Sequence, residues 1–176
     1  TALTDDFWSI TLPNDMATSS PRSPSLFAYH AALVLLEAKV LFSKMSVADM
    51  LDPTVQGNRS ATERHHLFPK DYLKSLGITD NRDINQIANF ALVEWGDNAK
   101  ISNQAPCTYL PELIARFGSA DLQSMQYWHA LPENWERMNY RDFLEKRREL
   151  IAQIIKDAYS KLMDESCATG VSERLP

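Results

Sequence analysis

The chain has 176 residues, 44% hydrophobic and 23% charged, which is the composition of an ordinary globular protein with one good core. Its formal net charge of −5 argues against a protein that coats polyanions, although a local nucleic-acid site remains compatible with it. Cys107 and Cys167 are too few and too unpatterned for a disulfide framework or a Cys-x-x-Cys zinc site, so we expect reduced thiols in a cytoplasmic protein.

No targeting segment with a basic start and an apolar centre opens the sequence. The most apolar stretch, residues 31–42, is interrupted by Glu37 and Lys39 and is shorter than the roughly 20 apolar residues that span a bilayer. We therefore expect no membrane partner. The sequence opens on Thr1 rather than on a methionine, and we expect it to be a piece of a longer protein.

We expect three parts: an N-terminal segment 1–24, a domain 25–163 and a flexible tail 164–176. In the first part, Pro13 with the two residues after it predicts a turn. Residues 26–43 predict a helix with Ser25 as its N-cap. This helix has almost no polar face, so we expect it to be buried in the fold or covered by another domain.

The middle of the domain predicts shorter elements. Residues 46–51 and 70–76 predict short helices, and residues 87–95 are β-branched and aromatic enough for a strand. Asp97 is placed to cap a short helix that runs from Asn98 towards residue 104.

Helices dominate the rest. Two are expected after Pro106, and Asn139 opens the longest one. His129, near the end of a helix, is expected to be a structural cation there. Basic residues on the first half of the last helix, Arg147 among them, are interleaved with acidic ones and predict a solvated face.

One constellation stands apart from this framework. Two adjacent histidines, His65 and His66, precede an apolar pair and Pro69. Asn89 follows His66 by 23 positions inside an apolar run, and Asn98 follows Asn89 by nine positions. An unpaired amide in an apolar run would cost about 1–3 kcal/mol. We therefore expect Asn89 to bond backbone, most simply that of the loop after His66.

These residue types are those that cut a phosphodiester with one metal ion. The reaction needs an activated water and positive charge against the phosphate. A neutral imidazole can accept a proton near pH 7. One imidazole and one amide oxygen can hold a divalent ion while leaving positions for phosphate and water.

A geometric objection applies to the histidine pair. Neighbouring side chains of a regular strand point to opposite faces, so His65 and His66 reach one site only where the strand twists or ends. Pro69, which cannot donate a ladder hydrogen bond, is consistent with an end here.

The set resembles the HNH class of His-Me finger (ββα-metal) nucleases. In that class one strand carries the general base, the next carries an orienting Asn, and the following helix supplies a metal ligand. The resemblance implies that His66 is the base, that Asn89 orients it, and that His65 and Asn98 bind the metal, Mg²⁺ or another divalent ion such as Mn²⁺. The implied fold is α+β: a mainly helical domain with an embedded ββα-metal finger at about 62–104.

More narrowly, residues 65–70 and 84–89 resemble the C-terminal nuclease domain of GmrSD-like modification-dependent restriction proteins. That family implies DNA, modified or not, as the substrate, a role in anti-phage restriction, and an N-terminal nucleotide-hydrolysing domain as partner. Lys100 matches a basic position near the phosphate, with Arg64 and Lys70 as weaker candidates for substrate binding. The cysteine pairs of many HNH domains are missing, so helices must support the finger.

Two other interpretations stay open. The chain could be a nucleic-acid- or protein-binding regulatory module whose metal site has decayed. It could also be a purely structural helical domain, in which His65 and His66 point to opposite sides.

Overall fold

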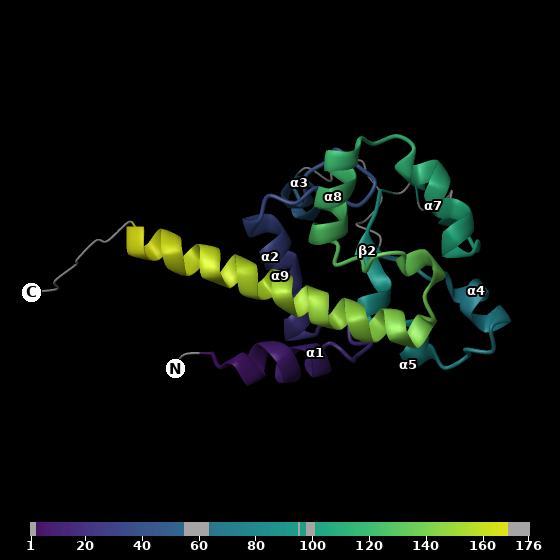
Figure 1. Ribbon diagram of the computed structural model, residues 1–176, viewed down its shortest axis with the longest axis horizontal. Helices are drawn as coiled ribbons and strands as arrows, with labels where there is room; N and C mark the ends of the chain where they lie inside the picture. The colour runs from purple at the N-terminus through teal and green to yellow at the C-terminus, as the bar shows by residue number, and fades with distance from the viewer. Residues whose placement is uncertain (1–2, 55–63, 95, 98–100, 169–176) are drawn as a thin grey trace, which may run out of the picture.

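The structure, a computed structural model, is a helix-rich α+β fold, and it describes residues 3–54, 64–94, 96–97 and 101–168 (Figure 1). The class predicted from the sequence, mainly helical with a small sheet, is therefore confirmed. In chain order the elements are η1 (Phe7–Thr11), α1 (Leu12–Asp15), α2 (Pro24–Leu35), α3 (Val47–Leu51), β1 (Arg64–His66), α4 (Lys70–Ser75), α5 (Asn81–Ile84), η2 (Ile87–Asn89), β2 (Phe90–Leu92), α7 (Pro106–Ile114), α8 (Ser119–Trp128), η3 (Trp135–Arg137) and α9 (Tyr140–Ala168).

The sheet is an antiparallel pair of short strands. β1 and β2 align so that His66 lies opposite Phe90 and His65 lies opposite Ala91. Beyond β2, Val93 forms a parallel bridge with Leu41. The Leu41 N–H donates to the carbonyl of Leu92, 3.1 Å between N and O, which partly covers the edge of β2.

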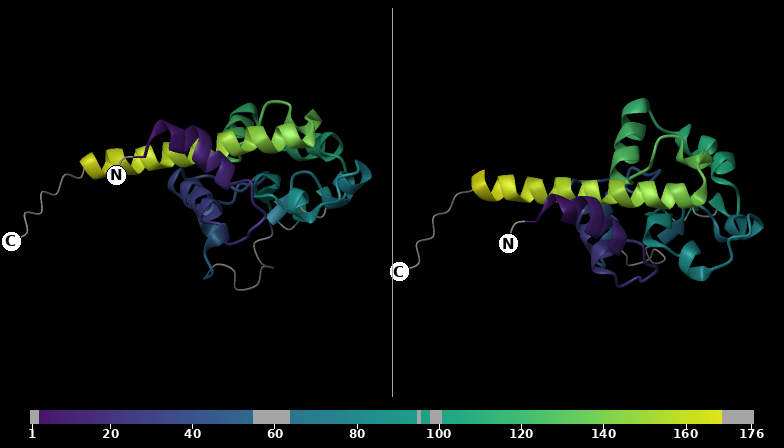
Figure 2. Two further views of the ribbon diagram at one scale, coloured as in Figure 1. Left: turned by 90° about the horizontal axis from the view of Figure 1, so that it is seen from below. Right: turned by 60° about the horizontal axis from the view of Figure 1, so that its bottom comes forward.

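Helix α9 packs against both hydrophobic clusters of the core. Its 29 residues span about 43 Å at 1.5 Å per residue. It crosses the view in Figure 1, with η1 and α1 lying along its middle, as both views of Figure 2 confirm. Its first turns pack into one hydrophobic cluster through Phe143 and Leu144, and later turns pack into a second through Ile151 and Ala158. α9 therefore joins the two halves of the core.

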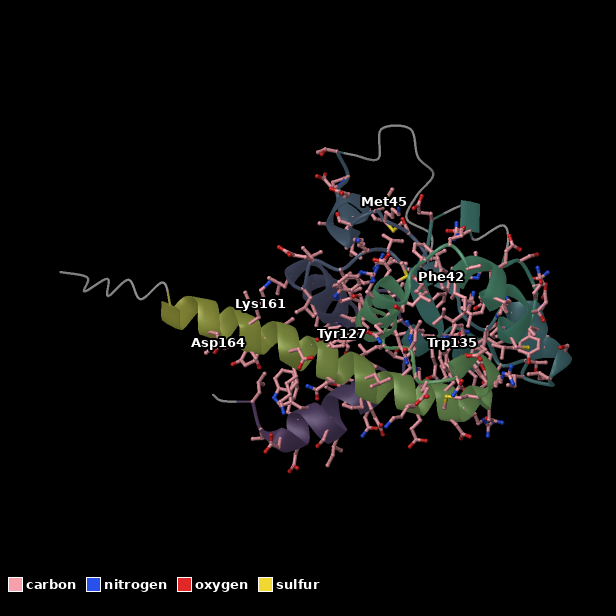
Figure 3. The ribbon with its side chains drawn as sticks, turned by 45° about the horizontal axis from the view of Figure 1, so that its top comes forward. Phe42, Met45, Tyr127, Trp135, Lys161 and Asp164 are labelled. Atoms are coloured by element: carbon pink, nitrogen blue, oxygen red, sulfur yellow. The ribbon has the colours of Figure 1, made fainter. Side chains whose placement is uncertain are left out.

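Figure 3 shows that the C-terminal end of α9 extends beyond the body of the molecule. Trp135 lies in the crowded body of the molecule near the start of this helix, whereas Lys161 and Asp164 lie on the end that extends beyond the body. Lys161 still reaches back, donating from Nζ to the Leu35 carbonyl at 2.9 Å. α9 continues to Ala168, into the segment expected to be a tail, and residues 169–176 lie outside the described part of the chain.

The turn predicted at Pro13 is wrong, because η1 and α1 form a continuous helical segment there. Pro13 lies in the first turn of α1, directly after the π-helical segment η1. Leu12 and Met16 are buried in the second cluster, and the Thr18 carbonyl accepts from the N–H of Ile87 at 2.9 Å. The N-terminal segment is thus packed into the fold and touches the segment that leads into β2.

The long helix predicted over residues 26–43 is wrong in its second half. α2 ends at Leu35, and Glu37 takes a left-handed conformation with φ 54°. The N–H of Ala38 then donates to the Leu33 carbonyl, which closes a Schellman motif of the kind usually built on glycine. Residues 38–41 follow as extended chain in which Ala38, Val40 and Leu41 are buried, which accounts for the apolar composition of this stretch. The predicted cap at Ser25 is also wrong, since Ser23 precedes the first residue of α2.

The strand predicted over residues 87–95 is shorter than expected. A 3-10 turn, η2, occupies residues 87–89, and only Phe90–Leu92 form β2. The short helices predicted at 46–51 and 70–76 and the helix starts at Pro106 and Asn139 are confirmed. Ser46 caps α3 through its hydroxyl, α4 covers residues 70–75, α7 starts at Pro106, and the Asn139 side chain caps α9 by accepting from the N–H of Arg141.

None of the helices in the described ranges has the length and apolarity needed to cross a membrane.

Candidate functional site

The loop that follows β1 is held by the side chain of Asn89. This amide is fully buried, and its Oδ1 accepts from the N–H of Phe68 at 2.9 Å. Its Nδ2 donates to the carbonyls of Phe68, at 3.1 Å, and Ile84, at 2.9 Å. The Asn89 carbonyl also accepts from the N–H of Leu67 at 2.8 Å. The expectation that Asn89 bonds the backbone just after His66 is therefore confirmed.

Two further contacts fix the same loop. The hydroxyl of Tyr109 donates to the Leu67 carbonyl at 2.6 Å, and burial raises the pKa of this phenol well above its ordinary value. The ring of Phe68 lies 4.7 Å from Phe143 and 5.9 Å from Trp135, measured between ring centroids. With Asn89, these contacts leave the backbone after His66 little freedom to move.

His66 lies at the last position of β1 and is half-buried. Its Nε2 is 2.9 Å from Oδ1 of Asn85, and its ring centroid is 4.4 Å from that of Phe90, its cross-strand neighbour. Burial lowers the pKa of His66; the bond to Asn85 opposes this shift, and the charge of Lys70 adds to it. The imidazole is therefore neutral near pH 7, as a general base requires.

His65 lies on the other face of the ribbon. Residues directly opposite each other in an antiparallel pair share a face, so His65 goes with Ala91 while His66 goes with Phe90. His65 is buried, at 8% exposure. Its neighbour Ala91 belongs to the same hydrophobic cluster as Ile101 of the following helix. His65 thus lies on the face of the ribbon that Ala91 contributes to this cluster.

After β2, Gly96 and Asp97 are helical, and so is Ile101, so Asp97 lies within a helix rather than before it. Asn98 and Lys100, the predicted metal ligand and basic contact, lie outside the described residues. The start of the helix is anchored by Arg116, whose Nη2 lies 3.0 Å from Oδ1 of Asp97.

Arg116 extends this anchor to a second segment. Its Nη2 also donates to the carbonyl of Phe42 at 3.2 Å. Arg116 therefore ties Asp97 to the turn at Phe42, the residue after the Leu41 that bridges Val93.

The remaining predicted substrate contacts come from basic side chains. Lys70 is exposed at the first position of α4, and its charge acts on His66. Arg64 opens β1 opposite Leu92, and its side chain lies outside the described part. Within the described ranges, no group of three or more His, Cys, Asp or Glu is arranged to hold a metal ion.

Arg147 is not part of a solvated basic face, and that prediction is wrong. Its side chain is completely buried. Nη1 donates to the Ala88 carbonyl at 2.7 Å and Nε to the His129 carbonyl at 3.1 Å. Burial lowers the pKa of the guanidinium. The signal was present in the sequence, since Arg147 lies four residues from both Phe143 and Ile151 on the apolar side of α9.

His129 is structural, but it is not the cation that its place at a helix end predicted. It is 1% exposed, and its Nε2 is 2.8 Å from the Lys39 carbonyl. Burial lowers its pKa to about 4. The ring is therefore neutral near pH 7, and because a carbonyl only accepts, its proton is on Nε2. Desolvation outweighs the attraction of the helix C-terminus here.

Asn85 is the site residue that the sequence prediction missed. It lies 19 positions from His66, and no spacing rule joins them.

Comparison of the chain with protein-family models, curated proteins and solved structures gives no match.

Proposed function

We propose that the chain is a metal-dependent endonuclease that hydrolyses DNA phosphodiester bonds. The observation that supports it best is the state of His66: a half-buried imidazole at the end of a strand, with a lowered pKa, on a loop held by Asn89. A neutral, positioned imidazole next to a basic side chain is what deprotonation of a water beside a phosphate requires.

In this proposal the residues divide the work. His66 accepts the proton of the attacking water, and Asn89 positions it indirectly, through the backbone of Phe68 rather than through the imidazole. Lys70, exposed beside His66, contacts the phosphate, and Lys100 and Arg64 are further candidates for the same contact. The reaction needs no covalent intermediate, so positioning and charge are the protein's main contributions.

A divalent ion, Mg²⁺ or Mn²⁺, would be held by His65 and Asn98. The order of the elements fits an embedded ββα-metal finger, because the antiparallel pair β1–β2 is followed directly by helical residues. A pair of one imidazole and one amide leaves most coordination positions to phosphate and water, as a catalytic rather than structural site needs. The ion would neutralise charge on the phosphate and the leaving oxygen.

By its resemblance to GmrSD-like restriction proteins, the chain would be the cutting module of a larger anti-phage protein. Its partner would be a nucleotide-hydrolysing domain, and its substrate DNA, modified or not.

One observation favours a non-catalytic candidate, the purely structural helical domain, which predicts a histidine pair that points to opposite sides. The strand register places His65 and His66 on opposite faces of the ribbon. His65, as metal ligand, and His66, as base, can act on one phosphodiester only if it lies at the end of the ribbon, where β1 stops.

A nicking assay separates the two candidates. Supercoiled plasmid, with and without cytosine modification, is incubated with the chain in Mg²⁺, Mn²⁺ or EDTA. The nuclease predicts relaxation that EDTA abolishes and that His65→Ala weakens, with His30→Ala as the matched histidine control. Neither binding nor relaxation of DNA in any metal would support the structural domain, and binding without relaxation would support a regulatory binding module whose metal site has decayed.

A further inference from the structure

The contact between Asn85 and His66 determines which nitrogen of the imidazole carries the proton. The 2.9 Å contact joins Nε2 of His66 to Oδ1 of Asn85. An amide oxygen only accepts hydrogen bonds, so Nε2 must donate. In a neutral imidazole the other nitrogen, Nδ1, then has a free lone pair.

Asn85 is itself held firmly enough to impose this choice. It is the C-cap of α5, and its N–H donates to the carbonyl of Asn81 at 3.0 Å. The residue before it, Ile84, is fully buried, and its carbonyl accepts from Nδ2 of Asn89 at 2.9 Å. The hydroxyl of Tyr140 on α9 donates to the neighbouring Asp83 carbonyl at 2.8 Å. The same asparagine that holds the loop after His66 therefore also holds the helix that presents Asn85.

Phe90 restrains the ring in the remaining direction. Its ring lies across the strand pair from His66, with centroids 4.4 Å apart and planes at 43°. A contact on one face and a hydrogen bond at one edge together restrict rotation of the imidazole about both side-chain torsions. Nδ1 is the nitrogen that neither contact engages.

We propose that Asn85 is a positioning residue for His66: it fixes the tautomer with the proton on Nε2 and so directs Nδ1 to the attacking water. The catalytic half of this statement rests on the proposed function, whereas the tautomer does not. In the cleavage step the water proton passes to Nδ1, the water oxygen bonds to phosphorus, and the bond from phosphorus to the leaving oxygen breaks. His66 is then doubly protonated, and its Nε2–H still donates its hydrogen bond to Oδ1 of Asn85.

Nitrogen-15 NMR of the histidine side chains in the whole 176-residue chain tests the tautomer without any cleavage. Among the four histidines, the signals of His66 are those that are missing from the spectrum of His66→Ala. We expect Nδ1 of His66 to be unprotonated. We expect its Nε2–H to exchange with water slowly enough to give a direct proton signal. Asn85→Leu, close to asparagine in shape but without an acceptor, should lose that proton signal, and Asn85→Asp should keep it. An unprotonated Nε2 in the wild type, or an unchanged Nε2–H signal in Asn85→Leu, would overturn the proposal.

Cleavage assays then test the catalytic half. We expect Asn85→Leu to lower the single-turnover rate about 10- to 100-fold, because it loses both tautomer and ring orientation. Asn85→Asp should recover most of the rate, and Asn81→Leu, an exposed change on the same helix, should retain it. Asn85→Leu cutting at the wild-type rate would refute the positioning role. A wild-type chain that cuts no DNA would refute the proposed function instead, while the NMR result still decides the tautomer.

Discussion

Replacing Asn89 by leucine should remove the hydrogen bonds that hold the candidate site without changing the volume of the buried side chain much. The Phe68 N–H and carbonyl would both lose their partner, while the Ile84 carbonyl would keep only the Tyr140 hydroxyl at 3.4 Å. Each buried main-chain group left unpaired costs about 1–3 kcal/mol. The loss for Phe68 alone is therefore about 2–6 kcal/mol, against a total stability of about 5–15 kcal/mol for a typical domain.

Urea unfolding followed by circular dichroism at pH 7 measures this loss as a fall in midpoint at unchanged slope. Asn103→Leu, an exposed asparagine outside the regular elements, is the matched control and should stay within about 0.5 kcal/mol of the wild type. An Asn89→Leu midpoint equal to that of the wild type would mean that the Phe68 backbone does not depend on this amide. The account of how the loop is held would then be refuted.

Three further predictions concern stability and substrate binding. Because the folded pKa of His129, about 4, lies below its ordinary value of 6.5, the unfolded chain binds the proton first as pH falls. Stability should therefore drop between about pH 6.5 and 4, by up to about 3 kcal/mol from this residue, and urea midpoints of His129→Gln should show a shallower slope with pH. Arg147→Lys cannot reach both carbonyls and should cost about 2–4 kcal/mol in the same assay, whereas the partly exposed neighbour Arg148→Lys should cost under about 1; equal effects would contradict the buried role. Lys70→Ala should weaken DNA binding and reduce its salt slope by about one, measured by fluorescence anisotropy, while Lys74→Ala on the same helix should not; no difference between them would remove Lys70 from the site.

Features with a local cause could be predicted from the sequence. Ser46, Pro106 and Asn139 mark helix starts because a cap or a fixed φ acts within one turn. Asn89 was identified because a buried amide must find a partner, and the nearest backbone was that of the loop after His66. The structure confirms this contact.

Features that depend on contacts between distant parts of the chain could not be predicted from the sequence. The left-handed Glu37 ends α2 without the glycine that usually announces such an end. His129 at its helix terminus has the sequence context of a cation, but burial against the Lys39 segment decides its protonation. Asn85 becomes the partner of His66 only through the packing of α5 against the ribbon. The roles of Asn98 and Lys100 remain predictions.

The most direct test of the proposed nuclease is single-turnover plasmid nicking by the wild-type chain and by His66→Ala, each in Mg²⁺ and in EDTA. The account predicts metal-dependent nicking by the wild type and a nicking rate that is about 10²- to 10⁴-fold lower in His66→Ala. The free energy of unfolding of His66→Ala should stay within about 1 kcal/mol of the wild type. Nicking by His66→Ala at the wild-type rate, or nicking that persists in EDTA, would contradict it.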